Sequence, residues 1–265
     1  DIDDDIALGK EVAKEVDKQL KVSKSKAMID RVERIGRELA AIANQTQVDT
    51  PWGDKRLSPF EYKFTVVEGD DVNAFSIPGG FIYIYEGLIK FSETDHELAG
   101  VIAHEISHAA SRHVAILRKE QSKVEAITIP AILIAILAGG ETGQGAAMAT
   151  QLVGQAIGSG WSVKAEKAAD YGGVEYMARS GYNATGILTF MERLAFEDTN
   201  ADIDWGIYRT HPPTKERVLA IRRLLEQRQI DVRRSETSTT FRAIPIEEVD
   251  GSHSIKLAGQ ILYTF

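Results

Sequence analysis

The chain has 265 residues, a net charge of -8 at pH 7 and no cysteine. It is long enough to bury a sizeable core, and its 43% apolar and 26% charged residues are ordinary for a globular protein. The acidic balance argues against a nucleic-acid partner, and without cysteine neither a disulfide framework nor a thiolate metal site can form. No run reaches the roughly 18–20 apolar residues that a membrane span needs.

The first part of the chain is expected to hold helices followed by short strands. Apolar residues recur at three- and four-residue spacing through residues 1–45, which predicts helices, and the proline-containing stretch 45–59 reads as a loop. Alternation then predicts a strand at 62–67. Two further strands, at 73–77 and 81–85, should form a hairpin, with the aromatic second strand in the core and the first strand at an exposed edge.

A capped helix is predicted next. Thr94 is a good N-cap with Glu97 three residues later, and an apolar stripe continues the helix to about Lys119. The most hydrophobic segment, residues 126–138, is too short to span a bilayer comfortably. It is expected to be a core or capping helix, with a lid over 126–160 or a membrane-surface contact as the alternatives.

Helices are also predicted in the second half of the chain, before its character changes in the tail. They cover residues 162–180, 184–195 and 214–228, and residues 200–210 read as a loop. Alternation from residue 239 onward predicts short strands. We therefore expect a main domain over 1–230 and a β-rich appendage over 231–265.

A pair of histidines lies inside the capped helix. In His104-Glu105-Ile106-Ser107-His108 the two histidines are four residues apart, so both imidazoles lie on one helical face and can approach one metal ion. Glu105 is rotated away from that face and can reach a water molecule at the metal without binding the metal, as a general base must. Two unrelated surface histidines are the alternative reading. The pattern predicts a zinc site with Glu105 as the catalytic base.

A third ligand is expected from the helix at 162–180. A catalytic zinc site takes three protein ligands and keeps a fourth position open, and Glu166 is a suitable third ligand. Asp170 lies one turn later on the same side and can accept a hydrogen bond from a ligating imidazole, which fixes the tautomer of that imidazole. The Lys-Ala-Glu-Lys sequence alone is typical of a solvated face, but the upstream motif and the neighbouring alanines favour a closely packed helix.

Four elements occur in order along the chain: Asn73-Ala74-Phe75…Pro78-Gly79-Gly80, His104 to His108, the Glu166…Asp170 helix, and Thr210-His211-Pro212…Arg217. Together they resemble the zinc peptidases related to the CAAX prenyl protease and the heat-shock protease HtpX, peptidase family forty-eight. The resemblance implies an α+β fold that is mainly helical, with an HExxH zincin core of the gluzincin type and a small β-sheet beside the active-site helix. It implies one zinc ion and a metalloendopeptidase.

The resemblance covers about residues 5 to 228 and leaves the tail outside. Because no spanning helix is predicted, the chain is more similar to the soluble periplasmic members tied to envelope quality control than to the membrane-embedded branches. This similarity implies a periplasmic location and extended or misfolded protein substrates. A zinc-containing chaperone or assembly factor with little proteolysis is the rival, although a purely structural site has no need of Glu105.

His211 has three interpretations. Pro212 and Pro213 fix the chain after it, so it could stabilise the oxyanion of the tetrahedral intermediate, or it could be a structural histidine at a helix entry. Soluble members of the family suggest a third role, in which His211 occupies the open zinc position until substrate displaces it. His113 lies off the ligand face of a continuous helix and is expected to be structural.

The predicted edge strand is also a candidate for binding substrate. A peptide could add to the strand that contains Asn73, Ala74 and Phe75, and so place its scissile carbonyl over the zinc.

Overall fold

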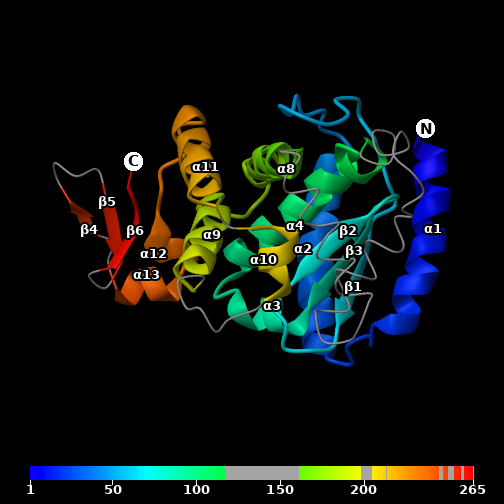
Figure 1. Ribbon diagram of the computed structural model, residues 1–265, viewed down its shortest axis with the longest axis horizontal. Coiled ribbons are helices and arrows are strands. Elements are labelled where there is room, and N and C mark those ends of the chain that lie inside the picture. Colours follow the sequence, from blue (N-terminus) through cyan, green and yellow to red (C-terminus); the bar gives the residue numbers. More distant parts are fainter. Residues whose placement is uncertain are drawn as a thin grey trace.

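The computed structural model describes residues 1–116, 161–197, 205–212 and 214–244, together with three strands of the tail. Helices dominate this part of the chain, and a small mixed sheet and a second sheet lie toward opposite ends of it (Figure 1). The elements in chain order are α1 (Ile2–Gln19), α2 (Lys26–Ala43), β1 (Lys63–Val67), β2 (Ala74–Ile77), β3 (Phe81–Tyr85), α3 (Glu86–Phe91), α4 (Asp95–Ala110), α8 (Trp161–Met177), α9 (Thr185–Glu197), α10 (Gly206–Thr210), α11 (Lys215–Gln227), α12 (Arg234–Thr237), α13 (Thr239–Ala243), β4 (Glu247–Val249), β5 (Ser254–Leu257) and β6 (Gln260–Thr264).

The first sheet has the strand order β1-β3-β2, with β1 parallel and β2 antiparallel to β3. Pro78-Gly79-Gly80 joins β2 to β3, and the two glycines have φ values of +80° and +85°. A Cβ atom on Gly79 would lie 2.9 Å from the Cα of Ile6, so the turn packs directly on α1. The predicted hairpin is confirmed. β2 is an edge strand as predicted, but its residues are mostly buried rather than exposed.

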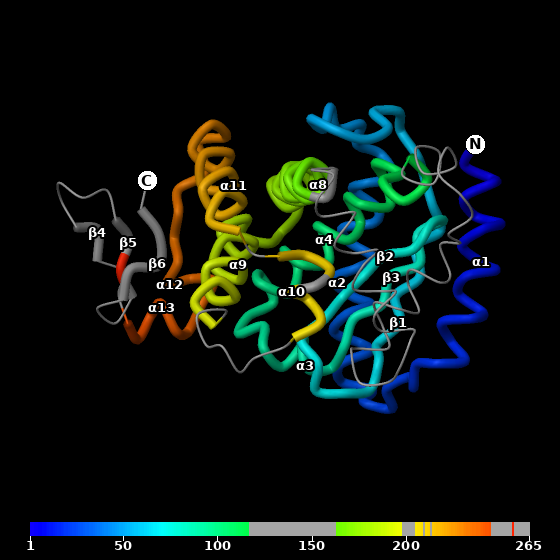
Figure 2. The backbone as a smooth tube through the Cα atoms, viewed as in Figure 1, coloured from blue at the N-terminus to red at the C-terminus, as the bar shows by residue number. Residues whose placement is uncertain are grey.

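Helices cover both faces of this sheet. α1 lies on one face, and α2 and α4 lie on the other (Figure 2). Val12 of α1 packs with Phe75 and Tyr83, whose rings stack 4.9 Å apart. Phe81 and Tyr85 belong to the same cluster, which confirms that the aromatic side chains of β3 share one buried face.

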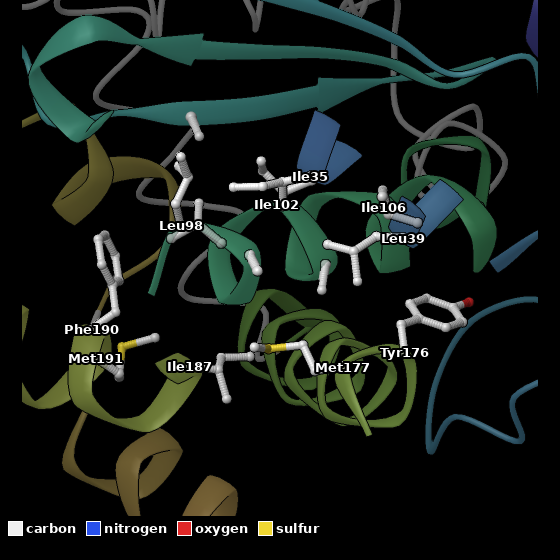
Figure 3. Packing of buried hydrophobic residues seen from close by; sticks show 14 of the residues in the cluster. Ile35, Leu39, Leu98, Ile102, Ile106, Tyr176, Met177, Ile187, Phe190 and Met191 are labelled. Carbon is white, nitrogen blue, oxygen red and sulfur yellow. The ribbon is translucent and has the colours of Figure 1, made fainter. Parts of the chain in front are cut away.

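α4 runs through the centre of the main core. It begins after Thr94, whose Oγ1 accepts a hydrogen bond from the N–H of Glu97 at 3.2 Å, as the capping pattern predicts. Leu98, Ile102 and Ile106 are fully buried among side chains from α2, α8 and α9 (Figure 3). Burying each of them stabilises the fold by about 1.5–3 kcal/mol. A helix packed in this way holds its polar side chains in fixed positions.

The prediction that this helix continues to about Lys119 is wrong, because α4 ends at Ala110. Arg112 then adopts a left-handed conformation with a φ of 52°. Its guanidinium donates to Asp5 at 2.5 Å and to Asp54 at 3.0 Å, and all three side chains are largely buried. These contacts hold a turn at a point where the local apolar periodicity still favours a helix.

Two other predictions of local structure are also wrong. Residues 239–243 form α13 rather than a strand, because Oγ of Ser238 accepts a hydrogen bond from the N–H of Phe241 and the Phe241 ring is buried. α10 lies within the predicted loop at 200–210, where the N–H of Gly206 donates to Asp71 at 2.8 Å. The strands predicted further along the tail are present as the antiparallel sheet β4-β5-β6.

Residues 117–160 lie outside the described residues, and so do the core helix, lid or membrane contact predicted over 126–160. Among the helices that the structure does describe, none combines the length and the apolar character needed to cross a lipid bilayer.

Candidate metal centre

α4 and α8 approach each other closely because small residues lie between them. Ala165, Ala168 and Ala169 of α8 are at most 2% exposed. A Cβ atom on Gly172 would lie only 2.1 Å from Oγ of Ser107 on α4. Larger side chains at these positions would push the helices apart, so the alanines and the glycine bring the polar residues of both helices within reach of each other.

Four buried side chains converge where the two helices meet: His104 and His108 from α4, Glu166 from α8, and His211, which caps α10. Each offers one ligand atom, and these atoms all lie within 4.8 Å of one another. Nε2 of His104 is 3.0 Å from Nε2 of His108, and each of these nitrogens is 3.2 Å from an oxygen of Glu166. The structure therefore brings together the three residues predicted as ligands and adds His211 to them.

Asp170 contacts the other ring nitrogen of His104. Its Oδ1 is 2.9 Å from Nδ1 of His104, which is the arrangement expected from the sequence. Arg217 donates to both oxygens of Asp170, at 2.7 and 2.8 Å, and its Nη1 is 3.1 Å from Glu166. Arg217 is 1% exposed, so its charge is fully engaged by these carboxylates. The sequence motif contains Arg217 but gives no sign of this role, because its main partner is 47 residues away.

Glu105 lies beside the four side chains without being one of them. Its Oε1 is 3.2 Å from Nε2 of His211, whereas its buried Oε2 has no hydrogen-bond partner among the described residues. Nδ1 of His211 faces the cluster, at 3.0 Å from Glu166 and 3.3 Å from Nε2 of His104. A carboxylate with a free acceptor next to a metal-binding cluster is suited to take up a proton.

His113 is a residue that sequence reasoning underestimated. Its Nδ1 lies 2.8 Å from Nδ1 of His108, and its Nε2 lies 3.3 Å from the carbonyl oxygen of Trp52. The ring is only 2% exposed. On a continuous helix His113 would face away from His108, and it reaches His108 only because the chain turns at Arg112. No local sequence pattern predicts that turn.

The charges of the cluster shift one another's pKa values. Burial lowers the pKa of His104, but Asp170 and Glu166 outweigh this effect and raise it to about 10. For His108 burial dominates, and its pKa falls to about 4. Burial opposes ionisation of Glu166, yet His211 and Arg217 hold its pKa well below the usual range. The carboxylate of Glu166 therefore stays ionised next to the imidazoles, as a metal ligand must be.

These residues fit a tetrahedral zinc ion. Bonds of about 2.0–2.1 Å to zinc place ligand atoms about 3.3–3.4 Å apart. The contacts of His104 with His108, Glu166 and His211, and those of Glu166 with His108 and His211, are 3.0 to 3.3 Å long, and all four ligand atoms lie within 4.8 Å of one another. A metal would displace one proton from the His104 ring, and because Nδ1 faces the Asp170 carboxylate, the remaining proton would stay on Nδ1 and leave the lone pair on Nε2. Two imidazole nitrogens and a carboxylate aimed at one point form a donor set for a cation.

The predicted substrate strand borders the same region. The N–H of Tyr85 donates to the carbonyl of Asn73, so in the alternation of an antiparallel pair Asn73 and Phe75 face β3, whereas Ala74 and Ser76 direct their backbone groups outward. The outward carbonyl of Val72 accepts a hydrogen bond from Ile207, the residue after the start of α10, at 3.0 Å. Ser76 of β2 and His108 of the cluster line one small cavity.

The four elements of the sequence motif thus meet at one place in the fold. The sequence profile of peptidase family M48 matches residues 30–225, which include every residue of the cluster. The chain belongs to this family. The match confirms the resemblance found in the sequence, and it ends within α11, so α12, α13 and the second sheet lie outside it.

Several M48-type proteases are similar to this chain. The beta-barrel assembly-enhancing protease of Escherichia coli (strain K12) is 30% identical over 177 residues, covering 65% of this chain and 34% of that protein. Its counterpart in Yersinia pestis is 25% identical over 264 residues, covering 98% of this chain and 52% of the relative. The metalloprotease LoiP of Escherichia coli is 31% identical over 165 residues, 62% of each chain. The chain therefore spans about a third to a half of the length of the beta-barrel assembly-enhancing proteases.

Proposed function

We propose that the chain is a zinc-dependent endopeptidase that hydrolyses peptide bonds in extended or misfolded proteins, with a zincin core of the gluzincin type. The observation that carries the proposal is the buried set of His104, His108 and Glu166, with Glu105 beside it. Membership of a peptidase family and the protease names of the relatives support it. Zinc is favoured because nitrogen and carboxylate ligands at tetrahedral spacing suit it.

In the proposed mechanism each polar residue has one task. His104, His108 and Glu166 would hold zinc, which, when bound, would supply a Lewis acid for a water molecule and for the peptide carbonyl. Glu105 accepts the proton of the attacking water and passes it to the leaving amine. Asp170 fixes the tautomer of His104, and Arg217 neutralises Asp170 and keeps the buried carboxylates ionised.

Of the three roles open to His211, its geometry favours occupation of the fourth ligand position. Nδ1 points at Glu166 and His104, as a ligand atom does, while Nε2 contacts Glu105. A histidine in that position excludes a water molecule from it. The same histidine also contacts Oε1 of Glu105 through its Nε2. Substrate binding would then have to displace His211 before hydrolysis begins.

His211→Ala is therefore expected to raise the rate of peptide hydrolysis. The variant leaves the fourth ligand position to a water molecule, and Oε1 of Glu105 no longer contacts an imidazole. The measurement is kcat/KM on a fluorogenic peptide at saturating zinc, with His96→Ala as the matched control, since His96 lies outside the cluster. A fall in kcat with unchanged zinc affinity would instead assign His211 to the oxyanion. No change in either quantity would leave a structural role.

The edge strand β2 is proposed to bind the substrate as an added strand, with the outward backbone groups of Ala74 and Ser76 as its partners. The cavity shared by Ser76 and His108 supports this placement. The side chain of Phe75 is 4% exposed and packs on Tyr83, so it contributes to the strand's position rather than to contact with the peptide.

Ser76→Pro is expected to lower kcat/KM by about three- to tenfold, because it removes one outward N–H, and a net hydrogen bond contributes about 0.5–1.5 kcal/mol. Edge strands tolerate proline, so the fold should persist. Ser76→Ala keeps the N–H and should cleave nearly as fast as wild type. The assay is steady-state cleavage of a fluorogenic peptide, with zinc content as a second readout. Equal losses in both variants would argue against strand addition.

His113 is proposed to orient His108. If Nε2 of His108 binds the metal, its Nδ1–H donates to His113, whose Nε2–H donates to the Trp52 carbonyl. His113→Leu breaks this chain and should weaken zinc binding by about 10- to 100-fold, as measured by competition with a chelating dye. His113→Gln offers an acceptor and a donor and should recover part of the loss. Wild-type affinity in the leucine variant would contradict the assignment.

We place this activity in protein quality control of the cell envelope, in the periplasm. The sequence resemblance supports this location, and so do relatives named for beta-barrel assembly, since single-chain β-barrels are proteins of the bacterial outer membrane. Those names also favour a second candidate, a zinc-containing assembly factor that cleaves little. In either case residues 1–230 would carry the zinc site, and 231–265 would form an appendage.

Cleavage of casein separates the two candidates. The wild-type chain and His211→Ala should both degrade casein, lose activity when a chelator removes the metal, and regain it when zinc is returned. If neither degrades casein although each holds one zinc, the assembly-factor candidate is favoured.

A further inference from the structure

Arg112 occupies a strained position between α4 and His113. Its φ of 52° lies in the left-handed region, which a residue other than glycine adopts only when its contacts compensate. Nε of Arg112 donates to Asp5 at 2.5 Å, and Nη1 donates to Asp54 at 3.0 Å. The turn at Arg112 brings Nδ1 of His113 to 2.8 Å from Nδ1 of His108. The contact of His113 with a proposed metal ligand therefore depends on the two carboxylates that hold Arg112.

The two carboxylates differ in their origin. Asp54 belongs to the loop that also contains Trp52, whose carbonyl contacts His113, and Asp54 pairs with Arg56 as well. Asp5 comes from α1, 107 residues before Arg112, and α1 lies outside residues 30–225, which the family profile matches. The side chain of Asp5 is only 7% exposed. Asp5 is thus a buried link from a helix beyond the profile to the neighbourhood of the metal centre.

Glycine lets α1 lie close to the rest of this region. A Cβ atom on Gly9 would lie 1.9 Å from the carbonyl oxygen of Pro78, so only glycine permits this approach of α1 to the turn between β2 and β3 (Figure 1). Asp5 is one helical turn before Gly9 and lies on the same side of α1. Asp5, Arg112 and His108 border one small cavity. The packed helix therefore presents its carboxylate to Arg112 from a fixed position.

We propose that Asp5 is a positioning residue of the metal centre. Through Arg112 it holds the turn that places His113 against His108, and it thereby raises the affinity of the chain for zinc. The inference rests on the proposed zinc site but not on peptide cleavage. The charge of Asp5 matters because its ion pair with Arg112 is largely buried, where water and salt screen it less than at the surface.

Asp5→Asn keeps the size of the side chain and one acceptor oxygen but removes the charge. Loss of a direct partner of a metal ligand lowers metal affinity by about 10- to 100-fold, and Asp5 acts two contacts further out, so we expect zinc affinity to fall by about three- to tenfold. Asp5→Glu keeps the carboxylate and should bind zinc more tightly than Asp5→Asn. Asp3→Asn is the matched control, because Asp3 is an exposed aspartate in the same first turn of α1. It should bind zinc as the wild type does.

A double-mutant cycle with His113→Leu separates positioning from general stability. Asp5→Asn should lower zinc affinity when His113 is present and leave it unchanged in the His113→Leu background. A merely structural role would lower the free energy of unfolding of the metal-free chain without making zinc affinity depend on His113. Zinc affinity is measured by competition with a chelating dye, after circular dichroism has verified that each variant is folded.

Wild-type affinity in folded Asp5→Asn, or an equal loss with and without His113, would overturn the proposal. If affinity falls in His113→Leu but not in Asp5→Asn, only this inference fails and the proposed zinc peptidase stands. No zinc binding by the wild type would overturn both. Should Asp5→Asn fail to fold, Arg112→Lys takes its place in the same cycle and decides by the same criteria, because lysine keeps the charge but cannot hold Asp5 and Asp54 together in a fork.

Discussion

Glu105→Gln should abolish peptide hydrolysis while leaving zinc binding intact. Glutamine keeps the size of the side chain and can still contact His211, but it cannot accept the proton of the attacking water. General base catalysis contributes about 10²- to 10⁴-fold to the rate, so casein cleavage should fall by about that factor. Zinc content should equal that of the wild type, because Glu105 is not among the four convergent ligand atoms.

The comparison is made in the wild-type chain and again in the His211→Ala variant, so that slow cleavage caused by His211 does not hide the effect. Glu33→Gln serves as the control, since Glu33 pairs with Arg37 on the exposed side of α2. Undiminished cleavage by Glu105→Gln would exclude Glu105 as the base. Loss of zinc together with activity would mean that Glu105 acts on the site's structure.

Arg217→Met should strongly destabilise the fold. Arg217 is the cation that faces Asp170 and Glu166 in a site where all three side chains are at most 4% exposed. Removing one partner of a buried ion pair leaves an uncompensated charge and costs about 3–5 kcal/mol. The free energy of unfolding, measured with urea at a fixed zinc concentration, should fall by about that amount.

Arg37→Met is the matched control for this experiment. Arg37 pairs with Glu33 at 2.9 Å on the exposed side of α2, and surface pairs of this kind contribute about 0–1 kcal/mol. Arg217→Lys should recover only part of the loss, because lysine keeps the charge but cannot donate to both oxygens of Asp170 in a fork. Equal decreases in the free energy of unfolding of the Arg37 and Arg217 variants would show that the buried ion pairs stabilise the fold no more than the exposed pair does.

Much of the site could be predicted because its determinants are local. The four-residue spacing of His104 and His108 requires only that the segment be helical, and the Thr94 cap with the apolar stripe behind it indicates that it is. Glu166 and Asp170 are likewise one turn apart on a helix. The hairpin turn was predictable for the same reason, since Pro78-Gly79-Gly80 breaks any continuous strand.

What could not be predicted depends on contacts between distant parts of the chain. α4 ends before the predicted residue because Arg112 pairs with Asp5 and Asp54, and no local sequence pattern identifies those partners. The link from His113 to His108 follows from that turn. α13 likewise depends on tertiary contacts as well as its cap, because Glu93 accepts hydrogen bonds from Ser238 and from the N–H of Thr240.

The most direct test of the account is the zinc content of the purified chain, measured by elemental analysis for the wild type, His104→Ala and His96→Ala after equilibration with zinc and removal of the excess. We predict one zinc per chain in the wild type and in His96→Ala, and none in His104→Ala, with circular dichroism verifying that each variant is folded. No zinc in the wild type, or a full equivalent retained by folded His104→Ala, would contradict the assignment of the metal centre.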